Sequence, residues 1–512
     1  MERNDVKKVT DKLEEKMKRR RKEEVAEPVA SELEEVQSKA SKRKQNKNNN
    51  EILMMLYLFI GIFILCIGYY SNFLIRNSST VINNSYNKRA DLLAETIYRG
   101  EILSSDYEKL AYSVDNGDGT ETRVYPYGSM FAHVVGRFKQ TKTGLEASQD
   151  FTMLTSSVNV FETMYYQLTG TKSPGNNIVT TLNVNLQKIA YDALGNRKGA
   201  VVVMEPGTGK ILAMVSKPDY DPNTVLEDWA TLIADENGDS PLLNRATQGL
   251  YPPGSTFKIV TLLSFIRQND AYDSYSYQCT GEEEFADSII HCYNNKAHGE
   301  ETLKQAFANS CNTAFANIGT LLDISAYRSL CDSLLFNATL PVDFAYKKSS
   351  FVLTKDSTEM DITQTVIGQG KTLMTPLHNA MLVSAIANGG NVMVPYLVSQ
   401  VENTHGNVIS KTGPKLFQSI MTAKEAEILT EYMQEVVESG TASSLKNSNY
   451  TVAGKTGTAE VGSNETAHAW FVGFAPTEQP EIVVSILVEN AGAGSEYAVP
   501  IAKKIFEAYL SK

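Results

Sequence analysis

The hydrophobic and polar positions divide the chain into stretches of different character. Residues 1–50 are rich in lysine and glutamate and end in "KQNKNNN", which predicts a solvated, partly helical tail. Residues 52–75 then run for 24 positions without a charged side chain, between Glu51 and Arg76. The remainder alternates β-branched runs, glycine-rich turns and longer apolar stretches. The pattern therefore predicts a polar tail, an apolar span and a folded part.

The apolar span predicts a transmembrane helix over residues 51–76. As a helix, 24 residues reach about 36 Å, which is enough to cross a bilayer core of about 30 Å. A cleaved signal peptide is the alternative, but the stretch is long, a polar segment precedes it and no A-x-A-like site follows. Positive residues crowd its N-terminal side with no acid among them: Lys39, Lys42, Arg43, Lys44 and Lys47. The positive-inside rule then predicts that the N-terminus lies in the cytoplasm and that residues 77–512 lie on the other side of the membrane.

The folded part predicts two units. Residues 77–176 mix short helical and strand-like pieces with turns such as "DNGDGT", which predicts a small non-catalytic pedestal domain. From residue 177 on, "GAVVVMEPGTGKILAMVS" predicts a hairpin, and "AWFVGFAPTEQPEIVVSILVE" predicts strand, turn and strand before a final helix from Tyr497 to Leu510. Strands at both ends with helices between them predict an α+β domain built on an antiparallel sheet, over residues 177–512.

Length and charge agree with this division. A chain of 512 residues is too long for one ordinary core, so more than one folded unit is expected. The net charge of −11 conceals an asymmetry, because residues 1–50 carry +4 and the remainder carries −15. An acidic body argues against nucleic acid as a partner.

The cysteines leave one question open. The chain has five of them: Cys66, Cys279, Cys292, Cys311 and Cys331. Cys66 lies in the apolar span, and the last two are typical of buried thiols. Cys279 and Cys292 bracket an acidic loop and either form a disulfide or, with His291 and His298, bind zinc. Their spacing matches no common zinc pattern, so no metal is expected, and their pairing stays open.

Two glycine-lysine stretches suggest phosphate loops but do not fit that motif. "EPGTGKIL" and "GQGKTLMTP" have Met204 and Thr365 where the leading glycine belongs. Nucleotide binding is therefore not predicted. The six histidines do not cluster, so a Ser-His-Asp triad is unsupported. No cofactor is expected.

The stretch "YPPGSTFKIV" holds the candidate nucleophile. Its S-x-x-K spacing also occurs at Ser41, Ser85 and Ser443, so spacing alone is weak. Here, however, Pro-Pro-Gly breaks the incoming chain, which predicts a helix that starts at Ser255, where free N–H groups favour developing negative charge. Lys258 lies one turn later on the same face of an apolar, buried helix. A serine hydroxyl needs a base to become nucleophilic, and a neutral lysine fits that role.

For Lys258 to be neutral near pH 7, its pKa must fall by about three units from its usual value of about 10.4. This corresponds to about 4 kcal/mol of destabilisation of the charged form. Burial lowers a lysine pKa, and a second nearby cation lowers it further. K-T-G occurs at Lys411 and at Lys455. The first continues into Pro414, which indicates a loop. The second lies in "YTVAGKTGTAE", a strand against which a substrate backbone can lie. We therefore expect Lys455 to be the second cation, on which the pKa shift of Lys258 depends.

A third motif lies between these two. In "ANSCNTAFANIG", Ser310 and Asn312 form an S-x-N pair, which is weak alone because it also occurs at Ser85 and Ser157. The S-x-N pair becomes informative because it occurs together with the other motifs: S-x-x-K, S-x-N and K-T-G-T follow one another in order within one predicted domain.

Together the three motifs resemble the serine penicillin-recognising enzymes. Residues 86–512 resemble a class B penicillin-binding protein, in stretches that include "YNKRADLLAETIYRGEI", "YPYGSMFAHVVG", "TLNVNLQKIA", "LAMVSKPDYDPN" and "GQGKTLMTPL". One departure is "LSSD" after Ile102, where the family has another segment. The resemblance implies a β-lactamase/D,D-peptidase-like domain with a five-stranded antiparallel sheet flanked by helices. It also implies a D,D-transpeptidase that cross-links peptidoglycan stem peptides through a serine acyl-enzyme and is inhibited by β-lactams.

The resemblance also implies residue roles in acylation. Ser255 would attack the penultimate D-Ala carbonyl, with Lys258 as its base. Ser310, near Lys455, would relay a proton to the leaving amine. Asn312 would hold the acyl amide.

Further roles fall on the K-T-G-T strand. Thr456, Gly457 and Thr458 would bind the substrate. Thr456 and Thr458 would hold its terminal carboxylate, with Lys455 supplying positive potential, and the backbone N–H groups of Ser255 and Thr458 would form the oxyanion hole. A SEDS-type glycan polymerase is the partner that the family implies. A β-lactamase or β-lactam sensor, a D,D-carboxypeptidase and a non-catalytic wall-complex protein are the alternatives. The role in elongation, division or sporulation stays open.

Overall fold

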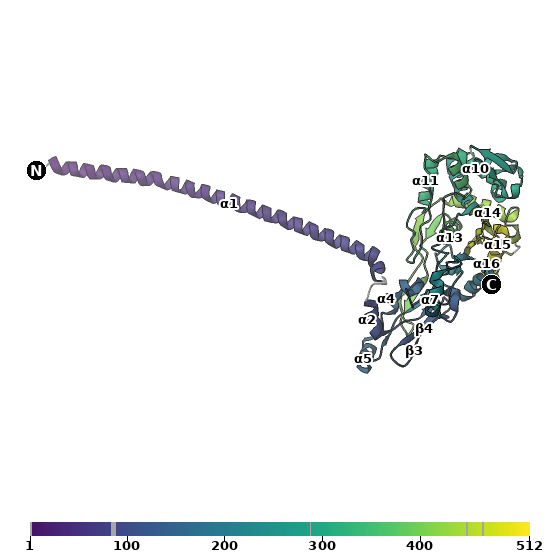
Figure 1. Ribbon diagram of the computed structural model, residues 1–512. Coiled ribbons are helices and arrows are strands. Elements are labelled where there is room, and N and C mark those ends of the chain that lie inside the picture. Colours follow the sequence, from purple (N-terminus) through teal and green to yellow (C-terminus); the bar gives the residue numbers. More distant parts are fainter. Residues whose placement is uncertain (1–2, 83–88, 287, 447–448, 463–464, 512) are drawn as a thin grey trace. The chain divides into compact units, whose positions relative to one another are not determined.

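The computed structural model describes the backbone of residues 3–82, 89–286, 288–446, 449–462 and 465–511. The chain forms two compact units, Met1–Val81 and Ile82–Lys512. The first is essentially one helix, α1 (Arg3–Ile82), drawn in purple and blue in Figure 1. The second contains all the strands that the structure describes.

Helix α1 contains the predicted span. Its segment Ser31–Leu74 is long and apolar enough to cross a membrane, and its apolar window is not buried inside the protein. Large apolar side chains such as Leu58, Phe59 and Leu65 are exposed. In water such a surface is costly, so a lipid environment suits it. The tail that the sequence predicted to be partly helical is helical from residue 3 on.

The first sheet of the second unit has six strands in the order β15-β14-β6-β2-β3-β4. β2 pairs with β6 in parallel, and the other pairs are antiparallel. Two of its strands come from far along the chain, beyond residue 390, which the sequence did not suggest. The strands are β2 (Ile102–Leu103), β3 (Lys109–Asp115), β4 (Glu121–Val124), β6 (Asn177–Thr180), β14 (Val398–Glu402) and β15 (Val408–Lys411). Short elements beside them are α2 (Arg89–Thr96), β1 (Ile97–Tyr98), η1 (Gly128–Phe131), α3 (Gly144–Ser148), α4 (Asp150–Met153), α5 (Val160–Thr169) and β5 (Ser173–Pro174).

The second sheet is the predicted five-stranded antiparallel one, in the order β17-β18-β19-β7-β8. The predicted hairpin forms β7 and β8, and the predicted C-terminal strand pair forms β18 and β19. β17, which carries K-T-G-T, lies at one edge. The bounds are β7 (Gly199–Met204), β8 (Ile211–Lys217), β17 (Ala453–Ala459), β18 (His468–Ala475) and β19 (Ile482–Val488).

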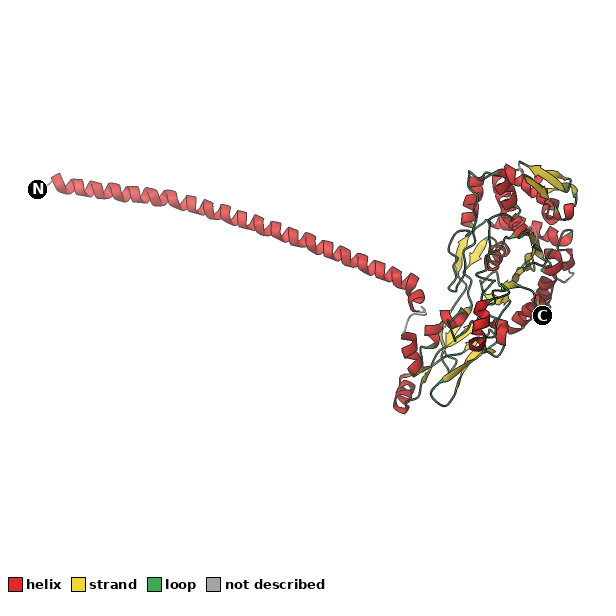
Figure 2. Cartoon of the chain, in the orientation of Figure 1, coloured by secondary structure: helices red, strands yellow, loops and turns green. Residues whose placement is uncertain are grey.

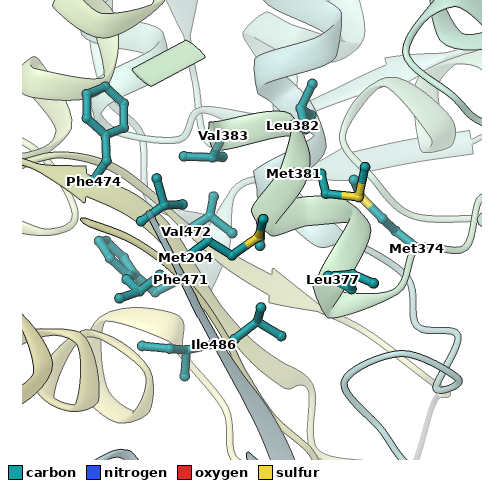
Figure 3. Close-up of a cluster of buried hydrophobic side chains, with 14 of the residues drawn as sticks. Met204, Met374, Leu377, Met381, Leu382, Val383, Phe471, Val472, Phe474 and Ile486 are labelled. Carbon is teal, nitrogen blue, oxygen red and sulfur yellow. The ribbon is translucent and has the colours of Figure 1, made fainter. Parts of the chain in front are cut away.

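Helices cover both faces of this sheet, as its residues require. Every residue of β7, β8, β18 and β19 is buried, which is the pattern of a sheet covered on both sides. α13 (Pro376–Ala387) packs against β7, β18 and β19, and α6 (Val184–Leu194) and α16 (Val499–Leu510) pack together against the same sheet. In Figure 3, Leu377, Met381 and Val383 of α13 lie in one buried hydrophobic cluster with Val472 and Phe474 of β18.

The remaining helices and small sheets lie before and after α13 in the sequence, and Figure 2 shows helices in red and strands in yellow. The helices are α7 (Val225–Ala234), η2 (Gly254–Phe257), α8 (Lys258–Gln268), η3 (Tyr272–Ser274), η4 (Tyr293–Asn295), α9 (Leu303–Ala308), α10 (Asn312–Leu321), α11 (Ile324–Ser333), α12 (Glu359–Val366), α14 (Ala423–Glu438), η5 (Ser443–Leu445) and α15 (Gly494–Tyr497). The strands are β9 (Ser276–Cys279), β10 (Glu282–Phe285), β11 (Ser288–His291), β12 (Gly299–Thr302), β13 (Asn391–Met393) and β16 (Leu416–Ser419).

Candidate active site

Ser255 lies in the short 3₁₀ helix η2, which continues into α8 at Lys258. Side chains three residues apart in a 3₁₀ helix are eclipsed, so Ser255 and Lys258 share one face. In the part of the chain that the structure describes, the Ser255 hydroxyl makes no hydrogen bond, and its residue lines a cleft. The serine is therefore open to a ligand.

The turn before Ser255 is fixed from two sides. The indole Nε1 of Trp470 donates to the carbonyl oxygen of Pro252 at 3.0 Å, and the backbone N–H of Gly254 donates to Gly368 at 2.9 Å. Gly254 has a φ of +53°, and a Cβ atom there would lie 2.7 Å from the carbonyl oxygen of Thr458. Only glycine allows this approach, which places Ser255 beside the edge strand β17.

Lys258 is fully buried beneath the cleft. Its Nζ donates to the backbone carbonyl of Ser310 and to Oδ1 of Asn312, both at 2.7 Å. It also lies 5.4 Å from the centroid of the Phe315 ring, a favourable distance for a cation. The structure thus brings the S-x-x-K and S-x-N motifs into direct contact.

Lys455 is equally buried and reaches the same serine from the other side. Its Nζ donates to Oγ of Ser310 at 2.9 Å and to the carbonyl of Thr456 at 3.1 Å. Nζ of Lys258 lies 3.4 Å from that same Oγ. The hydroxyl of Ser310 therefore connects the two ammonium groups, which lie within two hydrogen-bond lengths of each other.

The pKa values of both lysines are lowered, and burial, which the sequence analysis named together with a second cation, is the larger cause. Burial lowers the pKa of Lys258 to about 8, against smaller opposing effects of Cys311, Cys292 and Glu301. Burial also lowers the pKa of Lys455 well below its usual value, and the charge of Lys258 lowers it further. Burial is therefore the main cause of the Lys258 shift, and because the repulsion between the two ammonium groups is reciprocal, whichever lysine is charged lowers the pKa of the other. Burial dominates because each ammonium group has left water completely.

No carboxylate of the described residues lies within ion-pair distance of either lysine. Two cations held this close, both out of water, cannot both keep their protons cheaply near neutral pH. The pair therefore has one proton that is easily lost, which is what a general base requires.

Ser310 occupies a strained turn between α9 and α10. Its φ is +58°, in the left-handed region that residues other than glycine seldom adopt. The turn is held by the N–H of Cys311, which donates to Ala306 at 2.8 Å, and by Nδ2 of Asn312, which donates to His291 at 2.8 Å. Strain held in place by neighbouring bonds positions the Ser310 hydroxyl between the lysines.

Among the strands that the structure describes, β18 is the one neighbour of β17 in the sheet, so β17 offers an unpaired edge to the cleft. Such an edge can accept an extended peptide as an added strand. Gly457 is needed here, since a Cβ atom would lie 3.0 Å from both Thr256 and Trp470. The hydroxyl of Thr456 bonds that of Thr441 at 2.5 Å.

The cleft has a volume of about 750 Å³, which is large enough for a peptide end. Six of the predicted residues line it: Ser255, Ser310, Asn312, Thr456, Gly457 and Thr458. Lys258 and Lys455 lie beneath its floor. Gln369, Thr441 and Gly494 also line it and were not assigned from the sequence. Gln369 lies in "GQGKTLMTP", the stretch that suggests a phosphate loop but does not fit that motif. No sequence motif near Thr441 indicates a functional site.

The other copies of the motifs lie elsewhere. Lys411 of the first K-T-G is the exposed last residue of β15, and it does not line the cleft. Ser41 lies in α1, in the other unit. Ser85 falls outside the described residues.

Two family models match the chain. The model described as "Penicillin binding protein transpeptidase domain" matches residues 199–507, and the model described as "Penicillin binding protein A dimerisation domain" matches residues 99–178. The first contains all the predicted site residues and covers more than half of the chain.

Individual proteins agree with these matches. The chain is 32% identical to the peptidoglycan D,D-transpeptidase PbpA of Mycobacterium tuberculosis over 461 residues, which is 83% of this chain and 91% of that protein. It is similar to the structure of M. tuberculosis penicillin-binding protein A as its penicillin G acyl-enzyme complex, with a TM-score of 0.74, 33% identity, and coverage of 81% of this chain and 100% of that one. It is also similar to Pseudomonas aeruginosa PBP2 in complex with WCK 5153, with a TM-score of 0.70, 28% identity, and coverage of 81% and 97%.

Proposed function

This chain belongs to the family of penicillin-binding transpeptidases, and from that premise we propose that it is a peptidoglycan D,D-transpeptidase that acts through an acyl-enzyme on Ser255. The observation that carries the proposal is the arrangement around Ser310. Two fully buried lysines, Lys258 and Lys455, share its hydroxyl, and Ser310 lines the same cleft as Ser255. Beside them lies a free strand edge that can hold a peptide.

In acylation, Oγ of Ser255 attacks the carbonyl carbon of the penultimate D-Ala while Nζ of Lys258 takes the hydroxyl proton. The oxyanion that forms accepts hydrogen bonds from the N–H groups of Ser255 and Thr458, an effect worth about 3 kcal/mol. The peptide C–N bond then breaks. The proton passes through the Ser310 hydroxyl to the amine of the departing D-Ala, and the acyl group stays on Ser255.

Transfer reverses these steps with a different amine. The amino group of a neighbouring stem peptide attacks the acyl-enzyme carbonyl, loses its proton to Lys258 through Ser310, and forms the cross-link. Ser255 recovers its proton. Asn312, which accepts from Lys258 at 2.7 Å, lies where it would hold the acyl amide.

The substrate carboxylate decides which lysine keeps its proton. Bound at Thr456 and Thr458, that carboxylate places a negative charge near Lys455 and raises its pKa. A charged Lys455 in turn repels a proton from Lys258, because both ammonium groups bond Ser310. The base is therefore freed when a substrate with a terminal carboxylate arrives.

The rest of the chain fits a membrane-bound cell-wall enzyme. Residues 1–50 form the cytoplasmic tail, 51–76 the membrane helix, 77–176 the pedestal and 177–512 the catalytic domain, which lies outside the cell membrane. The positive charges before the span support this orientation. The partner is a SEDS-type glycan polymerase in the same membrane, which would supply the strands that are cross-linked in cell shape or division.

Labelling with fluorescent penicillin tests the nucleophile. The full chain in detergent is expected to form a stable adduct, and Ser255→Ala is expected to form none. Ser443→Ala, which removes another S-x-x-K serine, is the matched control and should label like the parent. If Ser255→Ala were labelled as strongly as the parent, Ser255 would not be the nucleophile.

A second assay tests the reaction class. With a stem peptide that ends in D-Ala-D-Ala and an amine acceptor, the chain should form a cross-linked product that mass spectrometry detects. Release of D-Ala without a cross-link would instead indicate a carboxypeptidase. Steady hydrolysis of penicillin in place of a stable adduct would indicate a β-lactamase.

A further inference from the structure

Three cysteines and a histidine from separate segments converge behind the turn that carries Ser310. Sγ of Cys279 lies 3.7 Å from Sγ of Cys292 and 3.4 Å from Nδ1 of His298. Sγ of Cys292 lies 3.7 Å from Sγ of Cys311. All four ligand atoms lie within 4.8 Å of one another.

The three shortest of these separations match the edges of a tetrahedral metal site. Zn–S bonds of about 2.3 Å and Zn–N bonds of about 2.0 Å place two sulfurs about 3.8 Å apart and a sulfur and a nitrogen about 3.5 Å apart. A disulfide requires about 2.05 Å. The pair Cys279 and Cys292, left open by the sequence, is therefore not bonded, and both thiols are free.

The fold of the segment from β9 to β12 produces this convergence. β9 pairs with β12 so that Cys279 lies opposite Gly299, which brings the neighbouring His298 to Cys279. The hairpin of β10 and β11 returns the chain, and the N–H of Cys292 then bonds the carbonyl of Gly281 at 2.8 Å. Cys311 joins from the N-cap position of α10.

Hydrogen-bond donors surround the sulfurs as they do in thiolate sites. The hydroxyl of Thr313 lies 3.4 Å from Sγ of Cys279 and of Cys311, and 3.7 Å from Sγ of Cys292. The N–H of Ala314, in the first turn of α10, donates to Sγ of Cys311 at 3.5 Å. Such second contacts orient metal ligands and favour their deprotonated form.

A buried carboxylate beside the cluster also lacks a cation. Glu301 is 2% exposed, and its Oε2 has no hydrogen-bond partner among the described residues. That oxygen lies 3.9 Å from Nδ1 of His298, and the other accepts from Asn309 at 2.6 Å. A buried negative charge without compensation is costly, and a divalent ion next to His298 would compensate it.

The cysteines form a small buried cluster of their own. It is separate from the main core and contains the three cysteines with Ala306 and Ala314, whereas Phe285, Ile290 and Leu303 of the same segment pack in the main core. The cluster itself buries few apolar atoms, so a metal bound there would add to its stability.

We propose that Cys279, Cys292, His298 and Cys311 bind one zinc ion as a closed, four-ligand structural site. Three soft thiolates and one imidazole in tetrahedral positions suit zinc. This revises the expectation of no metal. The ligands are separated by 12, 5 and 12 residues, which is too wide for a short zinc motif because each comes from a different strand or turn.

The ion would also position the candidate catalytic turn. Cys311 lies between Ser310 and Asn312, and Cys292 and His298 line the same cleft. Zinc would tie the wall of the cleft to this turn and hold the strained Ser310 in place. Its role is structural, since no ligand position is left open for substrate.

Metal analysis of the full chain, purified in detergent without chelator or added metal, tests the site directly. One zinc ion per chain is expected by plasma mass spectrometry, in the parent and in Ser255→Ala alike. Cys279→Ser and Cys311→Ser should lose it. Cys331→Ser, which removes a buried thiol outside the cluster, should retain it. Because zinc content does not depend on acylation, this result is independent of the proposed function.

A second measurement uses the parent protein and therefore tests the site even if the cysteine variants fail to fold. Replacement of the native metal by Co²⁺ in the parent should give the intense charge-transfer bands of thiolate ligation and the visible bands of a tetrahedral ion. Removal of the metal by a chelator should slow penicillin acylation at least tenfold, and added Zn²⁺ should restore the rate. The proposal is overturned if the parent holds no metal and five thiols titrate after denaturation, or if its mass is two lower because a disulfide has formed.

Discussion

Buried charge occurs in two regions of the second unit, with opposite arrangements. In the region of the first sheet, Arg99 and Arg123 each bond Glu146 at 2.7 Å, and Arg99 also bonds Asp150. All four side chains are nearly inaccessible. In the cleft, Lys258 and Lys455 are just as buried, yet among the described residues neither has a carboxylate partner.

The difference in partners gives the two regions different electrostatics. Burial alone would raise the pKa of Glu146, but Arg123 and Arg99 outweigh it and hold that pKa below its usual value. The charges there are fixed. The lysines have lowered pKa values instead, so their protons can move. The same burial thus supports structure where charges are paired and proton transfer where they are not.

The largest expected effect follows from removing the base. Lys258→Met keeps the length of the side chain but cannot accept a proton, so penicillin acylation should fall about 10³-fold. Its melting temperature should not fall, because the variant no longer buries an ammonium group. Stopped-flow acylation and a thermal melt measure both. Acylation within tenfold of the parent would show that another group is the base.

The converse change, in the paired network, should act on stability. Glu146→Gln leaves two buried guanidinium groups short of a partner and should lower the free energy of unfolding by about 3 kcal/mol. The folded fraction should still acylate at the parent rate. Denaturant unfolding measures this.

An exposed pair provides the control for that experiment. Glu427→Gln breaks the pair with Lys424 at 3.0 Å on the surface and should leave the free energy of unfolding nearly unchanged. Equal effects of Glu146→Gln and Glu427→Gln would mean that the buried network contributes nothing special.

Loss of the second lysine should give a smaller effect that depends on the ligand. Lys455→Met should slow acylation by a stem peptide about 10²-fold, because the bound carboxylate no longer meets a cation. The same peptide with a C-terminal amide should react slowly with parent and variant alike. If the variant prefers the peptide with a C-terminal carboxylate over the amide as strongly as the parent does, Lys455 does not recognise the carboxylate.

The sequence predicted features that depend on near neighbours or on plain hydrophobic pattern. Ser255 and Lys258 are one turn apart, and the strands of the five-stranded sheet are continuous apolar runs. The strand pattern around Lys455 favoured it over Lys411, and the order of the motifs singled out Ser310 and Asn312, whereas the resemblance to a family supplied the roles of these residues.

Features that depend on contacts between distant parts of the chain could not be predicted from the sequence. β14 and β15 join a sheet whose other strands begin some 220 residues or more earlier, and pairing at that distance leaves no local signal. The metal ligands have spacings set by strand register. Burial is the larger cause of the lowered pKa of both lysines, and only the folded structure shows that both are fully buried.

The pH dependence of acylation tests most directly whether an unpaired buried lysine is the base. Because burial lowers the pKa of Lys258 to about 8, its neutral form prevails above that pH and declines below it. The penicillin acylation rate of the parent should therefore rise about tenfold between pH 7 and pH 9, with a midpoint near 8, and then level off. Lys258→Met should show no such rise. A parent rate that stays flat across this range, or that falls as pH rises, would contradict the account.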